Sequence, residues 1–374
     1  MLLEAHHYLA ALQTYAGELA SARQSQDEVI THYDPKTHHD QKGRGPMEYG
    51  FQLFGVELAK VRDLAQTAEG MGFDLIVFPD HLVLEGPERQ YDPHALLYDS
   101  ISLAAIVAEA TRKIRVGHLV LCNQFRHPAV VAQSLVTLDH ISGGRLIAGL
   151  GAGWTEAEFR MTGIPFPPIS ERLSMLDESL DCIRSLWTNE RTNFEGKHYQ
   201  FRDAILWPKP LQQPHPPILL GGGGNGLLRI AAKHAEYVNI IPDAGKVGKF
   251  SVDNVKRMTD EAFRERISFV RAEARRAGRD PQAIKISNVM LVFMLVDTPA
   301  AAVQTIEAVA SGIGMSPETL RASPIAMIAT PEQCAIGLKR RINSWGVSQF
   351  IFGSFLGMDE KQIRLLREEV IPRI

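Results

Sequence analysis

The chain has 374 residues, enough to bury a large hydrophobic core as one large domain or as two ordinary ones. Hydrophobic residues make up 45% of it and charged residues 22%, which is ordinary for a soluble globular protein. The net charge of −3 argues against a dedicated nucleic-acid-binding protein, and no apolar run is long enough to span a membrane. The three cysteines, Cys122, Cys182 and Cys334, are too scattered for a disulfide framework or a zinc site, which favours a cytoplasmic location.

The first 46 residues differ in character from the rest of the chain. Apolar residues between Leu2 and Ala22 fit one helix, and a polar, His-rich stretch runs from Thr31 to Pro46. We expect residues 1–46 to be an N-terminal extension or linker, with its histidines solvated rather than bound to metal. A single domain is then predicted to occupy residues 47–374.

From Met47 onward, short apolar runs alternate with segments in which apolar residues recur at helical spacing. The predicted strands are Tyr49–Phe54, Leu75–Phe78, Ile114–Leu121, Arg145–Leu150, Pro217–Leu220, Tyr237–Ile241, Ile284–Leu295 and Val347–Phe352. The predicted helices are Glu57–Met71, Ala95–Ala110, Pro128–Ile141, Glu171–Trp187, a segment from Leu227 to His234, Asp260–Ala277, Pro299–Ala310, Pro331–Ser344 and a short one near Arg367. Phe194–Phe201 is expected to be a small excursion with strand character, and Asp243–Thr259 and Met315–Thr330 are expected to be loops.

Strands that alternate with helices imply a parallel sheet. The repeated unit therefore predicts an α/β fold, a (β/α)8 TIM barrel with insertions between its strands. The alternative is a doubly wound open sheet. Such a sheet usually begins with its glycine-rich fingerprint, whereas here the glycines follow the fifth predicted strand.

Those glycines, Gly221 to Gly224, stand between a predicted strand and a predicted helix. A glycine turn lets a ligand approach the main chain, and the free N–H groups of the helix start favour an anion, most often a phosphate. The spacing Gly221-x-Gly223-x-x-Gly226 also matches the dinucleotide fingerprint, so an NAD dehydrogenase stays open. A tight turn without any ligand is the simpler alternative.

In a barrel, the residues that follow each strand build the active site. The second predicted strand is followed by Asp80 and His81, and His81 is the best candidate for proton transfer. Cys122, Asn123 and Arg126 follow the third, and Ala152 and Trp154 follow the fourth. Arg126 fits an anion contact or a structural ion pair equally well, and we interpret His118, within the third strand, as facing the ligand. No spacing typical of a metal site or of a serine nucleophile occurs.

Several ordered motifs resemble those of the bacterial luciferase-like flavin or deazaflavin oxidoreductases. They include Val116–Leu121 with Phe125-Arg126-His127-Pro128, Ser142-Gly143-Gly144-Arg145, Gly149–Trp154, and Pro214–Pro217 leading into the glycines. Within that family the chain looks most like the branch that uses the deazaflavin coenzyme F-420. The resemblance implies a TIM barrel that holds a tricyclic ring at the strand ends.

It also implies site residues. His81 matches a catalytic histidine of deazaflavin dehydrogenases, and a non-proline cis peptide is expected at Leu119-Val120, behind the ring. Trp154 and His118 are expected to line the substrate pocket. The cofactor is expected to contact Asp80, Leu119, Val120, Cys122, Asn123, Ala152, Gly153, Trp154, Gly221, Gly222, Gly223, Gly224 and Asn225.

The sequence departs from one branch of the family. Its sugar-phosphate dehydrogenases have a glutamate at the position of Trp154 and a threonine at that of Ala152, so their substrate is not carried over. The prediction is hydride transfer between F-420 and a small organic substrate, with no partner nucleic acid, membrane or metal and with the dimer that the family implies.

Two other functions remain open. One is an FMN-dependent monooxygenase that uses reduced flavin and oxygen, and the other is a cofactor-binding paralogue without catalysis. Lys246, Lys249, Lys256 and Arg257 are candidates for a basic groove that would favour the acidic tail of F-420. The loops Asp243–Thr259 and Met315–Ser323 are candidate lids.

Overall fold

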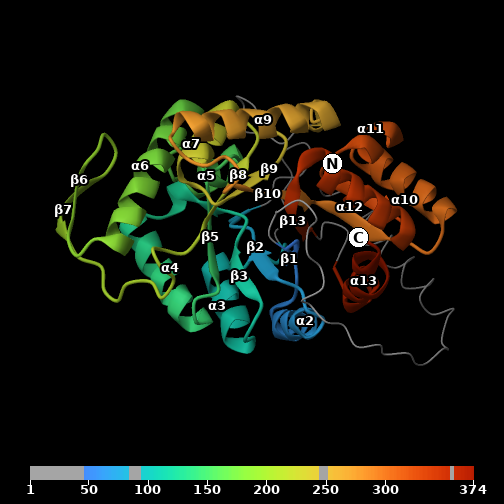
Figure 1. Cartoon of the computed structure of the whole chain (residues 1–374), viewed down its shortest axis with the longest axis horizontal. Coiled ribbons are helices and arrows are strands. Elements are labelled where there is room, and N and C mark those ends of the chain that lie inside the picture. The colour runs from blue at the N-terminus through green and yellow to red at the C-terminus, as the bar shows by residue number, and fades with distance from the viewer. Residues whose placement is uncertain (1–45, 84–93, 244–251, 354–357) are drawn as a thin grey trace.

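The computed structural model describes residues 46–83, 94–243, 252–353 and 358–374. Parallel strands close into a barrel, and helices surround it (Figure 1). The strands are β1 (Glu48–Gln52), β2 (Leu75–Phe78), β3 (Arg115–His118), β4 (Leu121–Cys122), β5 (Leu146–Gly151), β8 (Ile218–Gly222), β9 (Tyr237–Ile240), β10 (Lys285–Met290) and β13 (Val347–Phe352). Both β3 and β4 pair with β5, so together they fill one position, and the predicted eight-stranded TIM barrel is confirmed.

The helices lie between the strands along the chain, as the alternation of patterns predicts. They are α2 (Leu58–Gly70), α3 (Ser100–Ala110), α4 (Pro128–Ser142), α5 (Glu156–Thr162), α6 (Ile169–Thr188), α7 (Asn225–His234), α8 (Val252–Lys256), α9 (Asp260–Arg276), α10 (Pro299–Gly312), α11 (Pro317–Ala322), α12 (Pro331–Trp345) and α13 (Glu360–Leu365). Local signals set their ends. Pro128 begins α4, and Gly143 ends it in the left-handed conformation that glycine favours.

The barrel has an apolar interior and an apolar outer surface beneath the helices. The inner cluster contains Leu75, Val77, Ile147, Leu219, Tyr237, Val289 and Ile351. Alternate residues of the same strands, such as Ile76 and Phe78, join the larger cluster between the sheet and the helices. Burial on both faces explains why these strands are continuous apolar runs in the sequence.

The seventh predicted strand, Ile284–Leu295, is wrong as a single element. The chain leaves the barrel after β10, and β11 (Val292–Leu295) pairs instead with β12 (Ala326–Ala329) outside it. The predicted loop Met315–Thr330 is also wrong, because it contains α11 and β12. Leu320 and Ile325 are buried in a separate apolar cluster there, which argues against a mobile lid over Met315–Ser323.

Two further boundaries are informative. The third predicted strand divides into β3 and β4 around a cis peptide bond between Leu119 and Val120. The expected excursion at Phe194–Phe201 is an antiparallel hairpin of β6 (Thr192–Glu195) and β7 (Gln200–Ala204), which extends to the left in Figure 1. The predicted extension 1–46, apart from Pro46, and the candidate lysines Lys246 and Lys249 lie outside the described residues.

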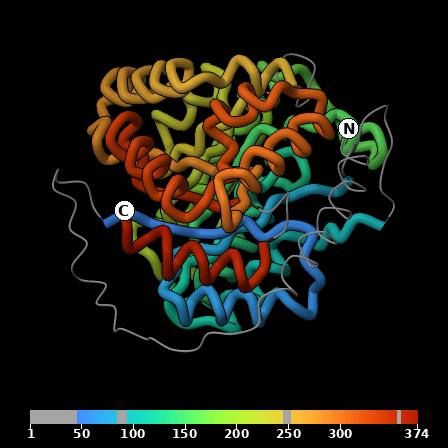
Figure 2. The backbone as a smooth tube through the Cα atoms, turned by 90° about the vertical axis from the view of Figure 1, so that its right-hand side faces the viewer, coloured from blue at the N-terminus to red at the C-terminus, as the bar shows by residue number. Residues whose placement is uncertain are grey.

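Figure 2 views the barrel from its side. The last described α-helix, α13, lies beside α2. The pairing of β1 with β13 joins the two ends of the barrel domain, for example Tyr49 with Phe350. Residues of the N-terminal and C-terminal quarters of the chain therefore complete one sheet.

Candidate active site at the barrel mouth

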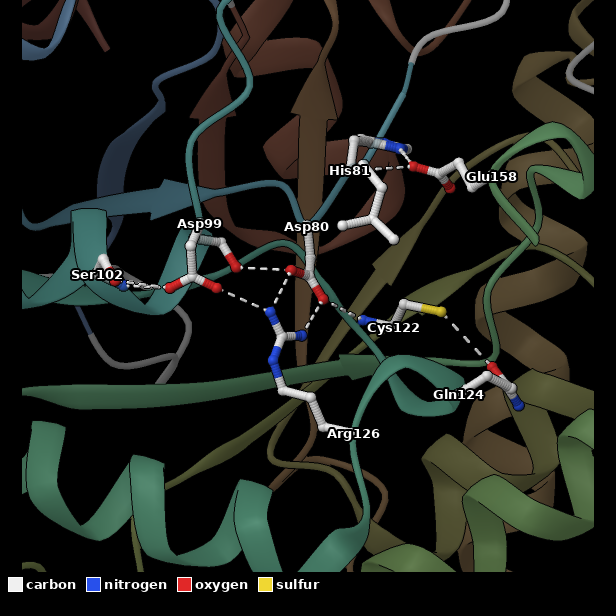
Figure 3. A network of polar contacts seen from close by, with 10 residues as sticks. Asp80, His81, Asp99, Ser102, Cys122, Gln124, Arg126 and Glu158 are labelled. Atoms are coloured by element: carbon white, nitrogen blue, oxygen red, sulfur yellow. Dashed lines mark hydrogen bonds and ion pairs between the residues drawn. The ribbon is translucent and has the colours of Figure 1, made fainter. Parts of the chain in front are cut away.

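The predicted site residues lie at or after the carboxyl ends of β2, β3, β4, β5 and β8. Because all barrel strands run parallel, these ends open at the same mouth of the barrel. The polar contacts at this mouth form two groups (Figure 3). One is centred on Asp80 and the other joins His81 to Glu158.

Asp80 is the centre of a dense network. Arg126 contacts both of its carboxylate oxygens, at 2.6 and 3.0 Å, and the side chain of Asp80 is only 4% exposed. The hydroxyl of Ser100 and the main-chain N–H of Cys122 also donate to this carboxylate, at 2.9 and 3.0 Å. Arg126 donates in addition to Asp99, which caps the start of α3. These contacts join the connection between β2 and α3 to the connection between β4 and α4 and occupy the Asp80 side chain, so we assign it to holding the rim together.

His81 lies beside this network and contacts a residue of α5. Its Nδ1 atom lies 3.0 Å from Oε1 of Glu158, a carboxylate that is 4% exposed. The rings of Trp154 and Phe54 approach His81 edge to face, with centroids 5.8 and 6.4 Å away. The structure thus brings together His81 and Trp154, as the sequence predicts, and adds Glu158, which no motif had indicated.

The cis peptide at Leu119-Val120 is confirmed and forms an apolar bulge at the mouth. Gln52, at the end of β1, donates to the carbonyl oxygen of Leu119 at 2.9 Å. A Cβ atom at Gly151 would lie 2.6 Å from Val120 Cγ2, and one at Gly221 would lie 3.2 Å from Val120 Cγ1. The glycines of β5 and β8 therefore leave the space that the bulge occupies.

His118 has a different environment from the one expected. It pairs in register with Phe78, and both are completely buried. Since Phe78 belongs to the outer cluster, His118 faces the helices rather than the barrel interior. Its ring nitrogens have no hydrogen-bond partner among the described residues, and burial lowers the pKa of its imidazole to about 4. We do not carry His118 into the proposed pocket.

The residues after β4 and β5 pack tightly. Cys122 is buried, which raises the pKa of its thiol to about 12, so it is held as a neutral thiol. Asn123 is buried and donates to the hydroxyl of Tyr199 at 3.3 Å. Gly153 has a φ of 69°, and a Cβ atom there would lie 2.8 Å from the sulfur of Cys122. Ala152 is buried, and its carbonyl oxygen accepts from Arg172 at 3.3 Å.

The glycine turn joins β8 to α7 as predicted, with Gly224 preceding Asn225, the first residue of the helix. A Cβ atom at Gly223 would lie 2.0 Å from the carbonyl oxygen of Ile241, so this glycine is required for packing against the end of β9. The exposed carboxylate of Asp243 lies near Gly224, and Arg266 donates to the carbonyl of Gly223 at 2.9 Å. An anion at this helix start would therefore lie near both the carboxylate of Asp243 and the guanidinium of Arg266.

Potential metal ligands gather away from the mouth. Within the described ranges, Asp177 and Asp181 of α6 and His234 of α7 form one such group. The ammonium of Lys233 lies 3.1 Å from a carboxylate oxygen of each aspartate, and His234 Nε2 lies 2.6 Å from Asp177. A hydrogen bond from His234 holds the pKa of Asp177 below its ordinary value. We interpret this group as an ion-pair network between two helices.

Comparison with known proteins places the barrel in a family. The family described as luciferase-like monooxygenase matches residues 31–333, which is most of the chain. This protein belongs to the luciferase-like monooxygenase family. Among the described residues of this family member, no helix is long and apolar enough to cross a membrane.

Its curated relatives include enzymes with two different cofactors. An F-420-dependent glucose-6-phosphate dehydrogenase of Amycolatopsis mediterranei is 32% identical over 225 residues, covering 56% of this chain and 66% of the relative. An FMNH2-dependent dimethylsulfone monooxygenase of Pseudomonas putida is 30% identical over 196 residues, covering 52% of each chain. The chain spans about half to two thirds of the length of the curated relatives it matches.

Solved structures agree on the fold. An F-420-dependent secondary alcohol dehydrogenase with an F-420–acetone adduct superposes with a TM-score of 0.70 at 21% identity, covering 88% of this chain and 99% of that one. The F-420-dependent tetrahydromethanopterin reductase of Methanopyrus kandleri gives 0.68 at 23% identity, covering 87% and 99%. At such identities the likeness supports the barrel fold and nothing finer.

Proposed function

We propose that this protein is an oxidoreductase that transfers a hydride between coenzyme F-420 and a small organic substrate with an alcohol or carbonyl group. The observation that carries the proposal is His81, a titratable side chain held at the barrel mouth between Trp154 and Glu158. A histidine can carry the proton that accompanies hydride transfer to or from a carbonyl group. Relatives that use F-420 add support.

The residues at the mouth fit a tricyclic ring with a phosphate-bearing tail. The Leu119-Val120 bulge is partly exposed and apolar, and Gly221 beside it adds no side chain, so a flat ring can lie against this surface. The main-chain N–H groups at the start of α7, near Gly224 and Asn225, suit the phosphate. When bound, F-420 would supply the hydride donor or acceptor.

The reactive group that the substrate needs follows from His81. A small hollow beside His81 is lined by Phe54, Leu96 and Tyr98 and also by Phe78 and Val61 of the cluster beneath the helices, so it lies to the side of the Leu119-Val120 bulge and sets no limit on the charge of the substrate. An alcohol or ketone needs only one proton donor or acceptor, and His81 can serve as both.

The second candidate is an FMN-dependent monooxygenase, because a relative that is 30% identical uses reduced FMN. The described part of the candidate basic groove supports F-420 only weakly. Lys256 lies 3.8 Å from Asp253 and Arg257 contacts Asn254, so both basic side chains are paired with residues of the short helix α8. Both cofactors have a similar ring and a phosphate, and these contacts do not separate them.

Fluorescence titration of the apoprotein with F-420 and with FMN tests the choice. Binding of F-420 at least tenfold tighter than FMN is expected, and tight FMN binding with negligible F-420 binding would overturn the proposal. Replacement of His81 by Ala then separates an enzyme from a cofactor-binding paralogue. We expect turnover of reduced F-420 with small ketones to fall about 100-fold or more while cofactor affinity stays within a factor of two or three. An unchanged rate would remove the proposed role of His81.

A further inference from the structure

The contacts of one buried carboxylate, Glu158, extend the proposed function. We infer that Glu158 is the positioning residue of the site: it fixes the orientation and the tautomer of His81, so that Nε2 alone exchanges a proton with the substrate. This inference rests on the proposed role of His81, and it assigns a task to a side chain that no sequence motif had singled out.

The geometry around Glu158 makes it an acceptor. Its Oε1 atom accepts the main-chain N–H of Leu82 at 2.7 Å and lies 3.0 Å from Nδ1 of His81. The N–H of Val83 approaches the same oxygen at 3.4 Å. Because this oxygen already accepts main-chain N–H groups, the hydrogen of the third contact belongs to His81. Nδ1 of His81 therefore carries a hydrogen, and in the neutral ring Nε2 does not.

The orientation of the ring follows from the same contacts. With Nδ1 bound to Glu158, Nε2 is turned away from the carboxylate, since the two nitrogens lie on different sides of the imidazole. The rings of Phe54 and Trp154 meet His81 at interplanar angles of 81° and 82°, and they limit its rotation. Figure 3 shows the carboxylate of Glu158 directed at His81, apart from the Asp80–Arg126 pair.

The location of Glu158 suits a positioning role. It lies in the first turn of α5, and its side chain is 4% exposed while that of His81 is 17% exposed. The same oxygen holds both the ring of His81 and the main chain that follows it, so the loop after β2 cannot shift without breaking these contacts. Burying a carboxylate lowers the stability of the fold unless its oxygens accept hydrogen bonds, and Oε1 of Glu158 accepts several.

The consequence for chemistry is a defined path for the proton. When a carbonyl carbon receives the hydride, the electron pair of its C=O bond moves to the oxygen, and that oxygen takes the proton from Nε2 of the protonated His81. The ring is left neutral with its Nδ1 hydrogen still bound to Glu158. In the reverse direction, Nε2 accepts the hydroxyl proton while the carbon gives up its hydride to the oxidised F-420 of the proposed function, and the carboxylate stabilises the imidazolium that forms.

Nitrogen-15 NMR of histidine-labelled protein tests the inference without substrate or cofactor. The chain has 13 histidines, and His81 is identified by the signal that disappears in a His81→Asn variant. At an alkaline pH at which the His81 signal no longer changes with pH, we expect the Nδ1–H tautomer in the wild type. A Glu158→Ala variant is expected to show the Nε2–H tautomer or a mixture. Glu156→Gln, which changes an exposed acid in the same helix turn, is expected to leave the spectrum unchanged.

Kinetics provide the second measurement. We expect Glu158→Ala to lower kcat about 10- to 100-fold with little change in KM, and Glu158→Gln, which keeps an acceptor oxygen, to recover part of the loss. If the alanine variant does not fold, Glu158→Asp gives the same test, because its shorter side chain cannot keep both contacts of 3.0 and 2.7 Å. An unchanged tautomer in the folded variant would overturn the positioning role. If Glu158→Ala changes the tautomer of His81 but His81→Ala leaves the rate unaffected, the positioning role stands and the proposed function is refuted.

Discussion

The ion pair between Asp80 and Arg126 gives the most direct test of how the barrel mouth is held together. Replacing Arg126 with Met keeps an apolar stem of similar length and removes the guanidinium. The Asp80 carboxylate, whose side chain is 4% exposed, would lose contacts of 2.6 and 3.0 Å and, of the donors in the described ranges, would keep the hydroxyl of Ser100 and the N–H of Cys122. We expect Arg126→Met to destabilise the protein and to disorder the rim.

The magnitude follows from the burial of the pair. Removing one partner of a buried ion pair costs about 3–5 kcal/mol, because the other charge stays in a poorly solvated place. Two donors remain on Asp80 and Arg126 is 19% exposed, so the low end, about 3 kcal/mol, is expected. At roughly 2 °C per kcal/mol for a chain of this size, the thermal midpoint should fall by about 6 °C.

The assay is thermal unfolding followed by circular dichroism, with a matched control on the surface. Arg62 pairs with Glu109 through side chains that are 52% and 62% exposed, so Arg62→Met should cost less than about 1 kcal/mol. The double variant Asp80→Asn with Arg126→Met should be more stable than Arg126→Met alone, because no buried charge is left unpaired. Equal midpoints for Arg126→Met and Arg62→Met would refute the reasoning.

Three more predictions concern the glycine turn and a buried histidine. Gly223→Ala should destabilise the fold, because its Cβ atom would lie 2.0 Å from the carbonyl oxygen of Ile241. The Cβ atom of Gly221→Ala would have its tightest contact at 3.2 Å, so this variant should stay folded and weaken cofactor binding in a fluorescence titration. Asp243→Asn should increase the affinity for phosphate-bearing cofactors about two- to fivefold, because it removes an exposed negative charge near the phosphate, an effect of about 0.5–1 kcal/mol. Weaker binding by this variant would contradict an anion site at the turn. The pKa of His118 is lowered to about 4 in the folded protein, whereas an unfolded histidine has a pKa near 6.5. Above pH 6.5 the ring is neutral in both states and does not oppose folding. As the pH falls from 6.5 towards 4, only the unfolded state binds the proton, so the free energy of unfolding decreases. Urea unfolding should show that His118→Gln removes about 3 kcal/mol of this pH dependence, and parallel curves for the two proteins would argue against a buried neutral ring.

The order of strands and helices was readable from the sequence. Runs such as Leu75–Phe78 are apolar because both faces of a barrel strand are buried, and helices such as α4 carry their own start and stop signals. The seventh strand was the exception. Ile284–Leu295 is apolar throughout, and no local feature distinguishes the part that stays in the barrel from the part that pairs with β12.

The candidate site divides in the same way. The sequence placed His81 and Trp154 at strand ends, and the family resemblance located the cis peptide at Leu119-Val120. It could not pair Asp80 with Arg126, 46 residues away, nor His81 with Glu158, 77 residues away. It also could not tell which face of β3 carries His118.

The physical reason is the range of the interactions. Helix caps, glycine turns and apolar periodicity depend on neighbours a few residues apart, so the sequence alone determined the repeating strand–helix unit and the loops that carry reactive side chains. Which carboxylate meets which base depends on the closure of the barrel, which brings the loops after β2, β4 and β5 to one mouth. Only the tertiary structure decided that Asp80 holds the rim and that Glu158 faces His81.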